Sequence, residues 1–482
     1  MCAVRFRTVG AVGFGVGRRL WGGLRRVSDF SAGYLIRTTQ AVLRARLRAE
    51  SQLNGWQGPA RQPRILVTAC GPFPIYSQTF VYQEVCALAD RGFHVRFSYS
   101  TLEDRAGLEP RFSLMWRVKR RLLLTSRLRD HDLRFYEMRM PDKVEALTLA
   151  VSEASGLSRE ALRDHDHFLQ AFSFTRMAAA WRPDYLHSYF FYEQTLFALV
   201  ASSLLGIPRG VSCYADHMLD DYPLKLVALN VTSCDVVVAT SQRIKAELEA
   251  IAGQGPLPHV IVKPNAIDTR VFKPSSRGGG RTGARPCLVS VCRIEPKKGL
   301  THLVDAVGLL RDQGVVVDLF LVGAPDDHMP ESLVCARDLD AQVARLGLGS
   351  AVHFEGRRSG NEVREFLARA DVFVAPFVEL ENGDKDGIST AVLEAMAAGC
   401  AIVATDAGST TEAIDSGENG IIVGQRDAAQ LASAIGTLLG DPALAARLGR
   451  NACEKAARHF DVAACEGAFH ERIRGAIARR ES

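Results

Sequence analysis

Two carboxylates separated by seven residues lie in the stretch GDKDGISTAVLEAM, residues 383–396. Asp386 directly precedes a glycine, and Glu394 lies in a segment of helix-forming composition that a glycine closes. Carboxylates in such a place suit the hydroxyl groups of a sugar or a ribose, which donate hydrogen bonds to charged acceptors. Taken alone, the stretch favours the plainer interpretation, an acidic loop followed by one surface glutamate.

The backbone between these two acids has features of an anion site. Gly387 lets the chain approach a ligand closely, because it has no side chain. The N–H groups near Ser389 and Thr390 stand at a helix start, where they are unpaired within the helix and favour an anion. We therefore count these three residues among the candidate binding residues.

Cations gather in a second stretch, SVCRIEPKKGL, where a strand is expected to end at Cys292. Arg293, Lys297 and Lys298 follow before a helix begins. Cations at a strand end beside a helix N-terminus form a binding site for phosphate. A solvated loop with incidental charge explains the same residues about equally well.

A third group follows the strand in GVSCYADHMLDD, which contains Asp216 and His217. A lone histidine beside an aspartate is more often structural than catalytic. The segment VKPNAID adds Asn265 and Asp268 where the first half of the chain ends.

Alternating strands and helices must position these residues. Short apolar runs predict strands in the first half at residues 64–69, 93–99, 184–190, 210–215, 235–240 and 259–264. A second series is predicted at residues 287–293, 315–323, 351–356, 371–377, 400–405 and 420–424. Charged helices are expected over 101–180, and further helices at 299–310, 361–370 and 390–398. The pattern predicts an α/β protein with two Rossmann-like domains, whose ligands bind in the cleft between them.

The predicted domain boundaries follow changes in composition along the 482 residues. They divide the chain into a basic extension (1–62), a first Rossmann-like domain (63–272), a linker (273–286), a second Rossmann-like domain (287–458) and a C-terminal helix that is expected to pack back on the first domain (459–482).

Positive charge is concentrated near the start of the chain. Residues 1–62 carry eleven arginines and two acids, a net +9 within an overall +5. A second cluster spans Arg117–Arg129. Both fit an anionic membrane surface, although a solvated arm or an organellar transit peptide also explains the extension. No aromatic interleaving or nucleic-acid motif accompanies the arginines, so we expect no nucleic-acid partner.

Other classes are excluded by simpler counts. No apolar run approaches the ~20 residues that a membrane-spanning helix needs. The extension has its charges mainly behind its apolar part, the reverse of a secretory signal. Eleven cysteines without a CxxC pair favour a reduced cytoplasmic location and no zinc site.

In combination, the motifs KPNAIDTRVF, SVCRIEPKKG, LFLVG, VHFEG, GDKDGISTAVLEAMAAG, IVATDAGSTTEAI and GENGIIV resemble the family 4 retaining glycosyltransferases of GT-B fold. The resemblance covers about residues 64–460 and is most specific over 262–425. The stretch FPIYSQTFVYQEVCALADRGFHV resembles the exopolysaccharide and colanic-acid-type branch. It implies a cytoplasmic hexosyltransferase, peripheral at the inner face of the membrane. Such an enzyme moves a sugar from a UDP- or GDP-sugar to a hydroxyl of a glycan or lipid-linked glycan in polysaccharide biosynthesis.

The resemblance also implies roles for individual residues. Arg293 and Lys298 match the cations that bind the donor diphosphate and stabilise it as leaving group. Glu394 matches the glutamate that holds the ribose, and Asp386 stands where a first glutamate contacts the transferred sugar. Gly71, in the loop after the first strand, would lie near the diphosphate.

Three departures from the family pattern concern the site. Asp386 replaces a glutamate and shortens its reach by one methylene, and Cys292 stands where glycine is common. The family's histidine follows an alanine, and Asp216 occupies that place here, with His217 one residue later. We expect His217 to act in the loop, with Asp216 as the alternative.

The implied chemistry needs neither a metal nor a cofactor, because fixed cations and a helix N-terminus stabilise the leaving group. In the front-face mechanism proposed for such enzymes, the leaving phosphate takes the acceptor's proton. The alternatives are a GT-B sugar-nucleotide epimerase, a phosphorylase with pyridoxal phosphate on a lysine, and a catalytically degenerate sugar-nucleotide-binding protein.

Overall fold

The computed structural model describes residues 62–68, 79–98, 126–214, 216–253, 255–274, 285–327 and 329–481, with scattered helical positions between 38 and 49. Four features predicted from the sequence lie wholly or largely outside the described residues. They are Gly71, the basic extension over 1–62, the side chains of the Arg117–Arg129 cluster, and most of the linker over 273–286.

The N-terminal lobe contains a parallel sheet of six strands in the order β2-β1-β3-β4-β5-β6. The strands are β1 (Arg64–Thr68), β2 (His94–Ser98), β3 (Tyr185–Tyr189), β4 (Arg209–Cys213), β5 (Val236–Ala239) and β6 (Val260–Val262). β1, β3, β4 and β5 are buried along their whole length, as expected for a parallel sheet covered on both faces. The six predicted strands of this half are confirmed.

The C-terminal lobe has a second parallel sheet, in the order β12-β11-β10-β7-β8-β9. Its strands are β7 (Cys287–Val291), β8 (Asp318–Val322), β9 (Val352–Gly356), β10 (Val372–Ala375), β11 (Ile402–Thr405) and β12 (Ile421–Val423). All six strands predicted for this half are confirmed.

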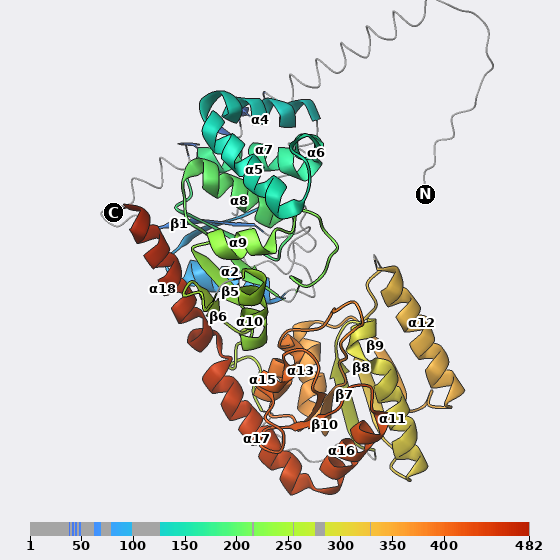
Figure 1. Ribbon diagram of the computed structural model, residues 1–482. Helices are drawn as coiled ribbons and strands as arrows, with labels where there is room; N and C mark the ends of the chain where they lie inside the picture. The colour runs from blue at the N-terminus through green and yellow to red at the C-terminus, as the bar shows by residue number, and fades with distance from the viewer. Residues whose placement is uncertain are drawn as a thin grey trace, which may run out of the picture.

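Helices cover both faces of the first sheet and form an extra helical layer at the top of Figure 1. They are α2 (Thr79–Asp90), α4 (Ser126–Arg139), α5 (Pro141–Ser155), α6 (Arg159–Asp164), α7 (Asp166–Trp181), α8 (Glu193–Leu205), α9 (Val227–Ser233) and α10 (Gln242–Ile251). Phe168, Phe172 and Trp181 of α7 anchor the core of this layer. The predicted charged helices of this region are therefore present in its described part, from residue 126 onward.

The second lobe carries a one-turn helix η3 and longer helices. They are η3 (Pro296–Lys298), α11 (Leu300–Asp312), α12 (Pro330–Arg345), α13 (Gly360–Arg369), α14 (Thr390–Ala397), α15 (Thr410–Ala413), α16 (Ala428–Gly440) and α17 (Pro442–His459). The last helix of the described chain, α18 (Val462–Glu481), returns to the first lobe. The capping box of Ser359 and Glu362 fixes the start of α13. The three helices predicted here are confirmed to within about two residues.

The last two helices join the lobes. α17 runs along the C-terminal lobe, and α18 continues along the N-terminal lobe, where it contacts α2 and β5 (Figure 1). At their junction Ile267 pairs with Asp461 as an isolated bridge. No helix of the described residues is long and apolar enough to cross a membrane.

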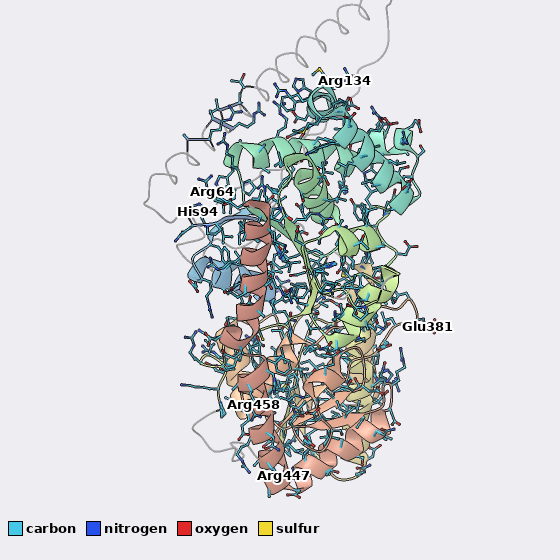
Figure 2. All side chains as sticks on the ribbon, turned by 60° about the vertical axis from the view of Figure 1, so that its left-hand side comes forward. Arg64, His94, Arg134, Glu381, Arg447 and Arg458 are labelled. Carbon is cyan, nitrogen blue, oxygen red and sulfur yellow. The ribbon has the colours of Figure 1, made fainter. Side chains whose placement is uncertain are left out.

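Both sheets contain a point where the strand order reverses, between β1 and β3 and between β7 and β10. In open parallel sheets, ligands bind beyond the carboxyl ends of the strands at such a point. Cys292 follows β7 and Pro376 follows β10. Glu381, farther along the segment after β10, lies at the height where the two lobes meet, whereas Arg447 and Arg458 lie on α17 below it (Figure 2).

Candidate functional site

The cationic turn after β7 is clipped to the segment after β10. Val378 N donates to the carbonyl of Lys297 over 2.9 Å. Gly299 has φ 59°, and a Cβ there would lie 2.0 Å from the carbonyl oxygen of Pro376, so only glycine fits. This packing places Lys298 beside the loop that carries Asp386.

Lys298 and Asp386 form a close ion pair. The Nζ of Lys298 lies 2.5 Å from Oδ2 of Asp386 and 4.8 Å from the ring centre of Phe377. Lys297 contributes a longer contact of 3.8 Å to Oδ1 and a shorter one of 2.9 Å to Asp384. Burial raises the pKa of Asp386, but the two lysines outweigh burial and leave the pKa below its ordinary value. Asp386 is therefore an ionised group whose nearest partner is a cation.

Arg293 joins the same cluster with more solvent contact. Its Nη1 lies 2.5 Å from Oε1 of the buried Glu295, and its side chain is 35% exposed. Its positive charge also helps to lower the pKa of Asp386. Arg293 is thus held on one side by Glu295 while the guanidinium still reaches solvent.

Glu394, on α14, is half-buried and stands apart from these charges. Burial alone raises the pKa of its carboxyl to about 8. Among the described residues, no hydrogen bond or ion pair of this carboxyl group is found. An accessible carboxyl in apolar surroundings without a protein partner is suited to accept hydrogen bonds from a ligand.

The two loop residues after β4 differ in how their side chains are occupied. His217 is buried, with Nδ1 3.2 Å from Sγ of Cys213 and Nε2 2.9 Å from Oε2 of Glu247. Asp216 accepts a hydrogen bond from Phe191 N over 2.7 Å, and its Oδ1 is buried without a partner among the described residues. Burial raises the pKa of Asp216. Both ring nitrogens of His217 are therefore taken by protein groups.

Three of the remaining predicted residues, Asn265, Thr390 and Gly387, lie at contacts between the two lobes. Asn265 donates from Nδ2 to the carbonyl of Ile388 over 3.1 Å and to Oγ1 of Thr390 over 3.3 Å. A Cβ on Gly387 would lie 3.3 Å from Oγ1 of Thr240, so this glycine lies against the N-terminal lobe. Ser389 is the N-cap residue of α14 without a capping hydrogen bond from its side chain. The binding roles predicted for these residues stay predictions, and the structure adds an interdomain contact.

Known proteins match this chain in both sequence and fold. A family model described as "Glycosyl transferases group 1" matches residues 285–441. We call residues 285–441 the group 1 domain, after the family model that they match.

Two relatives extend the similarity. The chain is 33% identical over 252 residues to alpha-maltose-1-phosphate synthase of Mycobacterium tuberculosis strain H37Rv, covering 48% of this chain and 61% of the relative. It is 24% identical to the putative colanic acid biosynthesis glycosyltransferase WcaL of Escherichia coli K12, and that match covers 75% of this chain and 87% of the relative. The first match thus spans less than two thirds of that relative's own length.

Solved structures support the fold. Anabaena Alr3699/HepE, in complex with UDP and glucose, superposes with a TM-score of 0.63 at 18% identity, covering 85% of this chain and 99% of that one. Sucrose-phosphate synthase of Thermosynechococcus elongatus superposes with a TM-score of 0.63 at 20% identity, and the match covers 87% of this chain and 100% of that one. The predicted α/β fold of GT-B type and the resemblance to sugar transferases are confirmed, while the assignment to family 4 stays a prediction.

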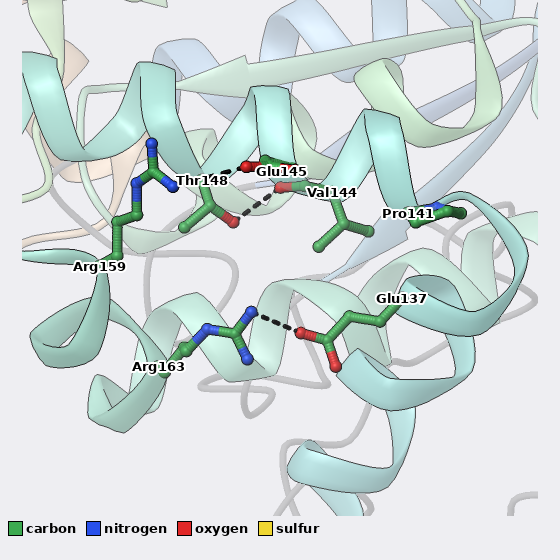
Figure 3. A pocket seen from close by; sticks show the side chains of 7 residues that line it. All are labelled: Glu137, Pro141, Val144, Glu145, Thr148, Arg159 and Arg163. Atoms are coloured by element: carbon green, nitrogen blue, oxygen red, sulfur yellow. Dashed lines mark hydrogen bonds and ion pairs between the residues drawn. The ribbon is translucent and has the colours of Figure 1, made fainter.

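The group 1 domain has an apolar cavity beside its cationic turn. Its volume is about 340 Å³, and it lies at the carboxyl ends of β7, β8 and β9. The lining residues are Ile294, Gly323, Ala324, Pro325, Ala336, Asp340, Phe354 and Gly356. A second cavity of about 340 Å³ lies in the helical layer of the other lobe, where Arg163 and Glu137 form an ion pair of 2.8 Å (Figure 3).

Sequence reasoning missed a set of residues that cross between the lobes. Arg243 and Glu247 on α10 contact the loop of the group 1 domain that carries Lys385 and Asp386. Glu412 accepts hydrogen bonds from the first backbone N–H groups of α10. The spacing of four between Arg243 and Glu247 is visible in the sequence, but it is common on solvated helices. Among the described residues, no group of three or more candidate ligands is arranged to hold a metal ion.

Proposed function

We propose that this protein is a retaining glycosyltransferase. It transfers a hexosyl group from a nucleotide-diphosphate sugar to a hydroxyl of a glycan or lipid-linked glycan in polysaccharide biosynthesis. The observation that carries the proposal is the group of Arg293, Lys298, Asp386 and Glu394 on the group 1 domain, beyond the carboxyl ends of β7 and β10. HepE, which has the same fold, is bound to UDP and to glucose in its structure.

The donor diphosphate would bind to Arg293 and Lys298. Its phosphate oxygens compete with Glu295 and Asp386 for these two cations, since both cations are paired in the free protein. As the bond to the sugar breaks, negative charge grows on the diphosphate, and fixed cations stabilise it without reorganising. No metal ion enters this scheme.

The other parts of the donor have matching surroundings. The carboxyl of Glu394 would accept from the ribose hydroxyls, because it has no protein partner within the described chain. The apolar cavity is lined by Ile294, which directly follows Arg293, and by Phe354. It offers space for the base. The base would be uracil or guanine, as expected for a UDP- or GDP-sugar.

Transfer would occur on one face of the sugar. The acceptor oxygen bonds to the anomeric carbon, the bond from that carbon to the phosphate oxygen breaks, and the phosphate takes the acceptor's proton. Asp386 would contact the transferred sugar through an oxygen not engaged by Lys298. The acceptor would approach from the N-terminal lobe, at an anionic membrane surface on the cytoplasmic side.

The test uses the full-length protein with a panel of UDP-, GDP- and ADP-sugars. One donor should raise the melting temperature, because a ligand that binds only the folded state stabilises it. Release of nucleotide diphosphate from that donor should be lost in Glu394→Ala and kept in Glu381→Ala, which changes an exposed acid in the loop between β10 and α14. No thermal shift and no release with any donor would refute the proposal.

A further inference from the structure

One carboxylate on α10 connects three separate segments of the protein. Glu247 accepts from Nη1 of Arg243, 2.8 Å from each of its oxygens. Its Oε2 lies 2.9 Å from Nε2 of His217, in the loop after β4. Its Oε1 lies 3.3 Å from Nζ of Lys385, in the other lobe.

The contact with Glu247 fixes the proton position on His217. A carboxylate only accepts hydrogen bonds, so Nε2 of the imidazole must carry the hydrogen. In the neutral imidazole Nδ1 would then be the accepting nitrogen, and it lies 3.2 Å from Sγ of Cys213. Partial burial raises the pKa of Glu247, but hydrogen bonds from His217 and Arg243 outweigh it and bring the pKa to about 2. Glu247 is therefore charged throughout the working pH range.

Arg243 carries the connection into the group 1 domain. Its Nη2 donates to the carbonyl of Asp386 over 3.2 Å, and its Nε donates to Oγ of Ser409 over 3.0 Å. Glu412 accepts from the backbone N–H of Arg243 over 3.0 Å, so the start of α10 is capped by the opposite lobe. The guanidinium of Arg243 is thus held by Glu247 through Nη1 and by the backbone carbonyl of Asp386 through Nη2.

We propose that Glu247 is a positioning residue for transfer. It orients His217 and, through Arg243 and Lys385, holds residues 383–387, the donor loop, against the N-terminal lobe. This proposal rests on the proposed function, because the donor loop matters for transfer only if a sugar nucleotide binds there. Glu247 itself touches neither the donor nor the acceptor in this scheme.

The arrangement predicts that a change at Glu247 affects donor binding and turnover differently. The proposed contacts with the nucleotide part of the donor, Arg293, Lys298 and Glu394, lie outside the donor loop and remain when Glu247 is changed. The alignment of the two lobes depends on Glu247, and a small misplacement of reacting groups lowers the rate strongly. Removing the carboxylate should therefore lower kcat while leaving donor affinity nearly unchanged.

The experiment compares Glu247→Gln and Glu247→Ala with Glu249→Gln. Glu249 lies on the same helix but pairs with Lys245 and with Leu257 N of its own lobe, so it is a matched control. We expect kcat to fall about 10-fold in Glu247→Gln and about 10²-fold in Glu247→Ala, with the donor Kd within about threefold. Glu249→Gln should stay within about twofold of the unchanged protein.

A second readout does not depend on turnover. Long-range ¹H–¹⁵N spectra of the histidine rings, with His217 assigned by its loss in His217→Gln, should show an Nε2–H tautomer in the unchanged protein. Glu247→Ala should convert that signal to a mixture of tautomers. Equal kcat in all Glu247 variants, or an unaltered His217 signal, would overturn the positioning role. Absence of turnover in the unchanged protein would instead overturn the proposed function, and the His217 signal would still test the contact.

Discussion

Lys298 and Asp386 are 88 residues apart in sequence, yet the Nζ of one lies 2.5 Å from Oδ2 of the other. The pair stands at the strand-order reversal of the second sheet, where the donor diphosphate is proposed to bind. Asp386 therefore balances the charge of Lys298 before a donor arrives. A diphosphate that reaches Lys298 must share it with that carboxylate.

This pairing predicts unequal effects for its two members. Lys298→Met removes a diphosphate cation and leaves the partly buried Asp386 without its closest partner, so kcat/KM should fall about 10²- to 10³-fold. Asp386→Asn releases Lys298 to the diphosphate, so UDP should bind as tightly or more tightly while kcat falls. Steady-state kinetics and UDP titration check both. Lys455→Met, which breaks an exposed ion pair with Asp415, is the control, and an equally inactive control would contradict the assignment.

Glu394 should make stability depend on pH. Its ordinary pKa is 4.5, and burial raises the pKa to about 8 in the folded protein. Between these values the folded state holds a proton that the unfolded state has lost, so the free energy of unfolding falls as pH rises through this window. In Glu394→Gln the residue at this position carries no titrating proton, so this fall in the free energy of unfolding should be absent. Urea unfolding should show the variant gaining about 1–3 kcal/mol over the unchanged protein between pH 5 and pH 8.5. Parallel pH profiles of the free energy of unfolding in the variant and the unchanged protein would contradict this prediction.

The same carboxyl should release a proton when a nucleotide binds. Ribose hydroxyls donate to the charged form of Glu394, so binding lowers its pKa and drives off the proton held at pH 7. UDP affinity should then rise with pH between about 6.5 and 8, by at most about tenfold per pH unit. Calorimetry in buffers of different ionisation enthalpy measures the proton directly. Glu394→Gln should bind UDP with no such buffer dependence, and release of the proton from that variant would assign it elsewhere.

Gly408 supports the donor loop through its lack of a side chain. It has φ 60°, and a Cβ there would lie 2.1 Å from the carbonyl oxygen of Asp386. Gly408→Ala must push this backbone away, so kcat/KM should fall about 10- to 10²-fold. Gly417 also has a positive φ of 83°, but nothing lies within 4 Å of its Cβ position. Gly417→Ala should cost only backbone strain, about 1–2 kcal/mol of stability, and leave kcat/KM near its original value. Equal kinetics in the two variants would refute the steric argument.

The strands were predictable because each is a short apolar run that the parallel sheet buries, and the separating helices followed from composition. Arg293, Lys298 and Asp386 could be named because each follows a strand that ends at the same sheet edge. The ion pair between Lys298 and Asp386 could not be predicted, since it depends on how two loops pack. The contacts of Arg243 with Ser409 and Asp386 span more than 140 residues and leave no local pattern. The contacts of the His217 ring with Cys213 and Glu247 could not be predicted from the sequence either.

A buried cation between two acids lies where α18 packs on the N-terminal lobe. The Nζ of Lys263 lies 2.5 Å from Oε2 of Glu84 on α2 and 2.9 Å from Oε1 of Glu466 on α18. All three side chains are less than 5% exposed. One cation does not fully offset two buried acids, so burial still raises the pKa of Glu466 to about 7, with Lys263 opposing it.

Lys263→Met should therefore destabilise the protein by about 3–5 kcal/mol, because it leaves two carboxyls in the interior without a cation. The triple variant Lys263→Met, Glu84→Gln and Glu466→Gln should recover much of this loss, since no buried charge is then uncompensated. Lys245→Met breaks the partly exposed pair with Glu249 and should cost about 1 kcal/mol or less. Chemical unfolding measures all three. If Lys263→Met costs no more than Lys245→Met, this cation does not hold α18 on the N-terminal lobe, and the apolar contacts of α18 must do so.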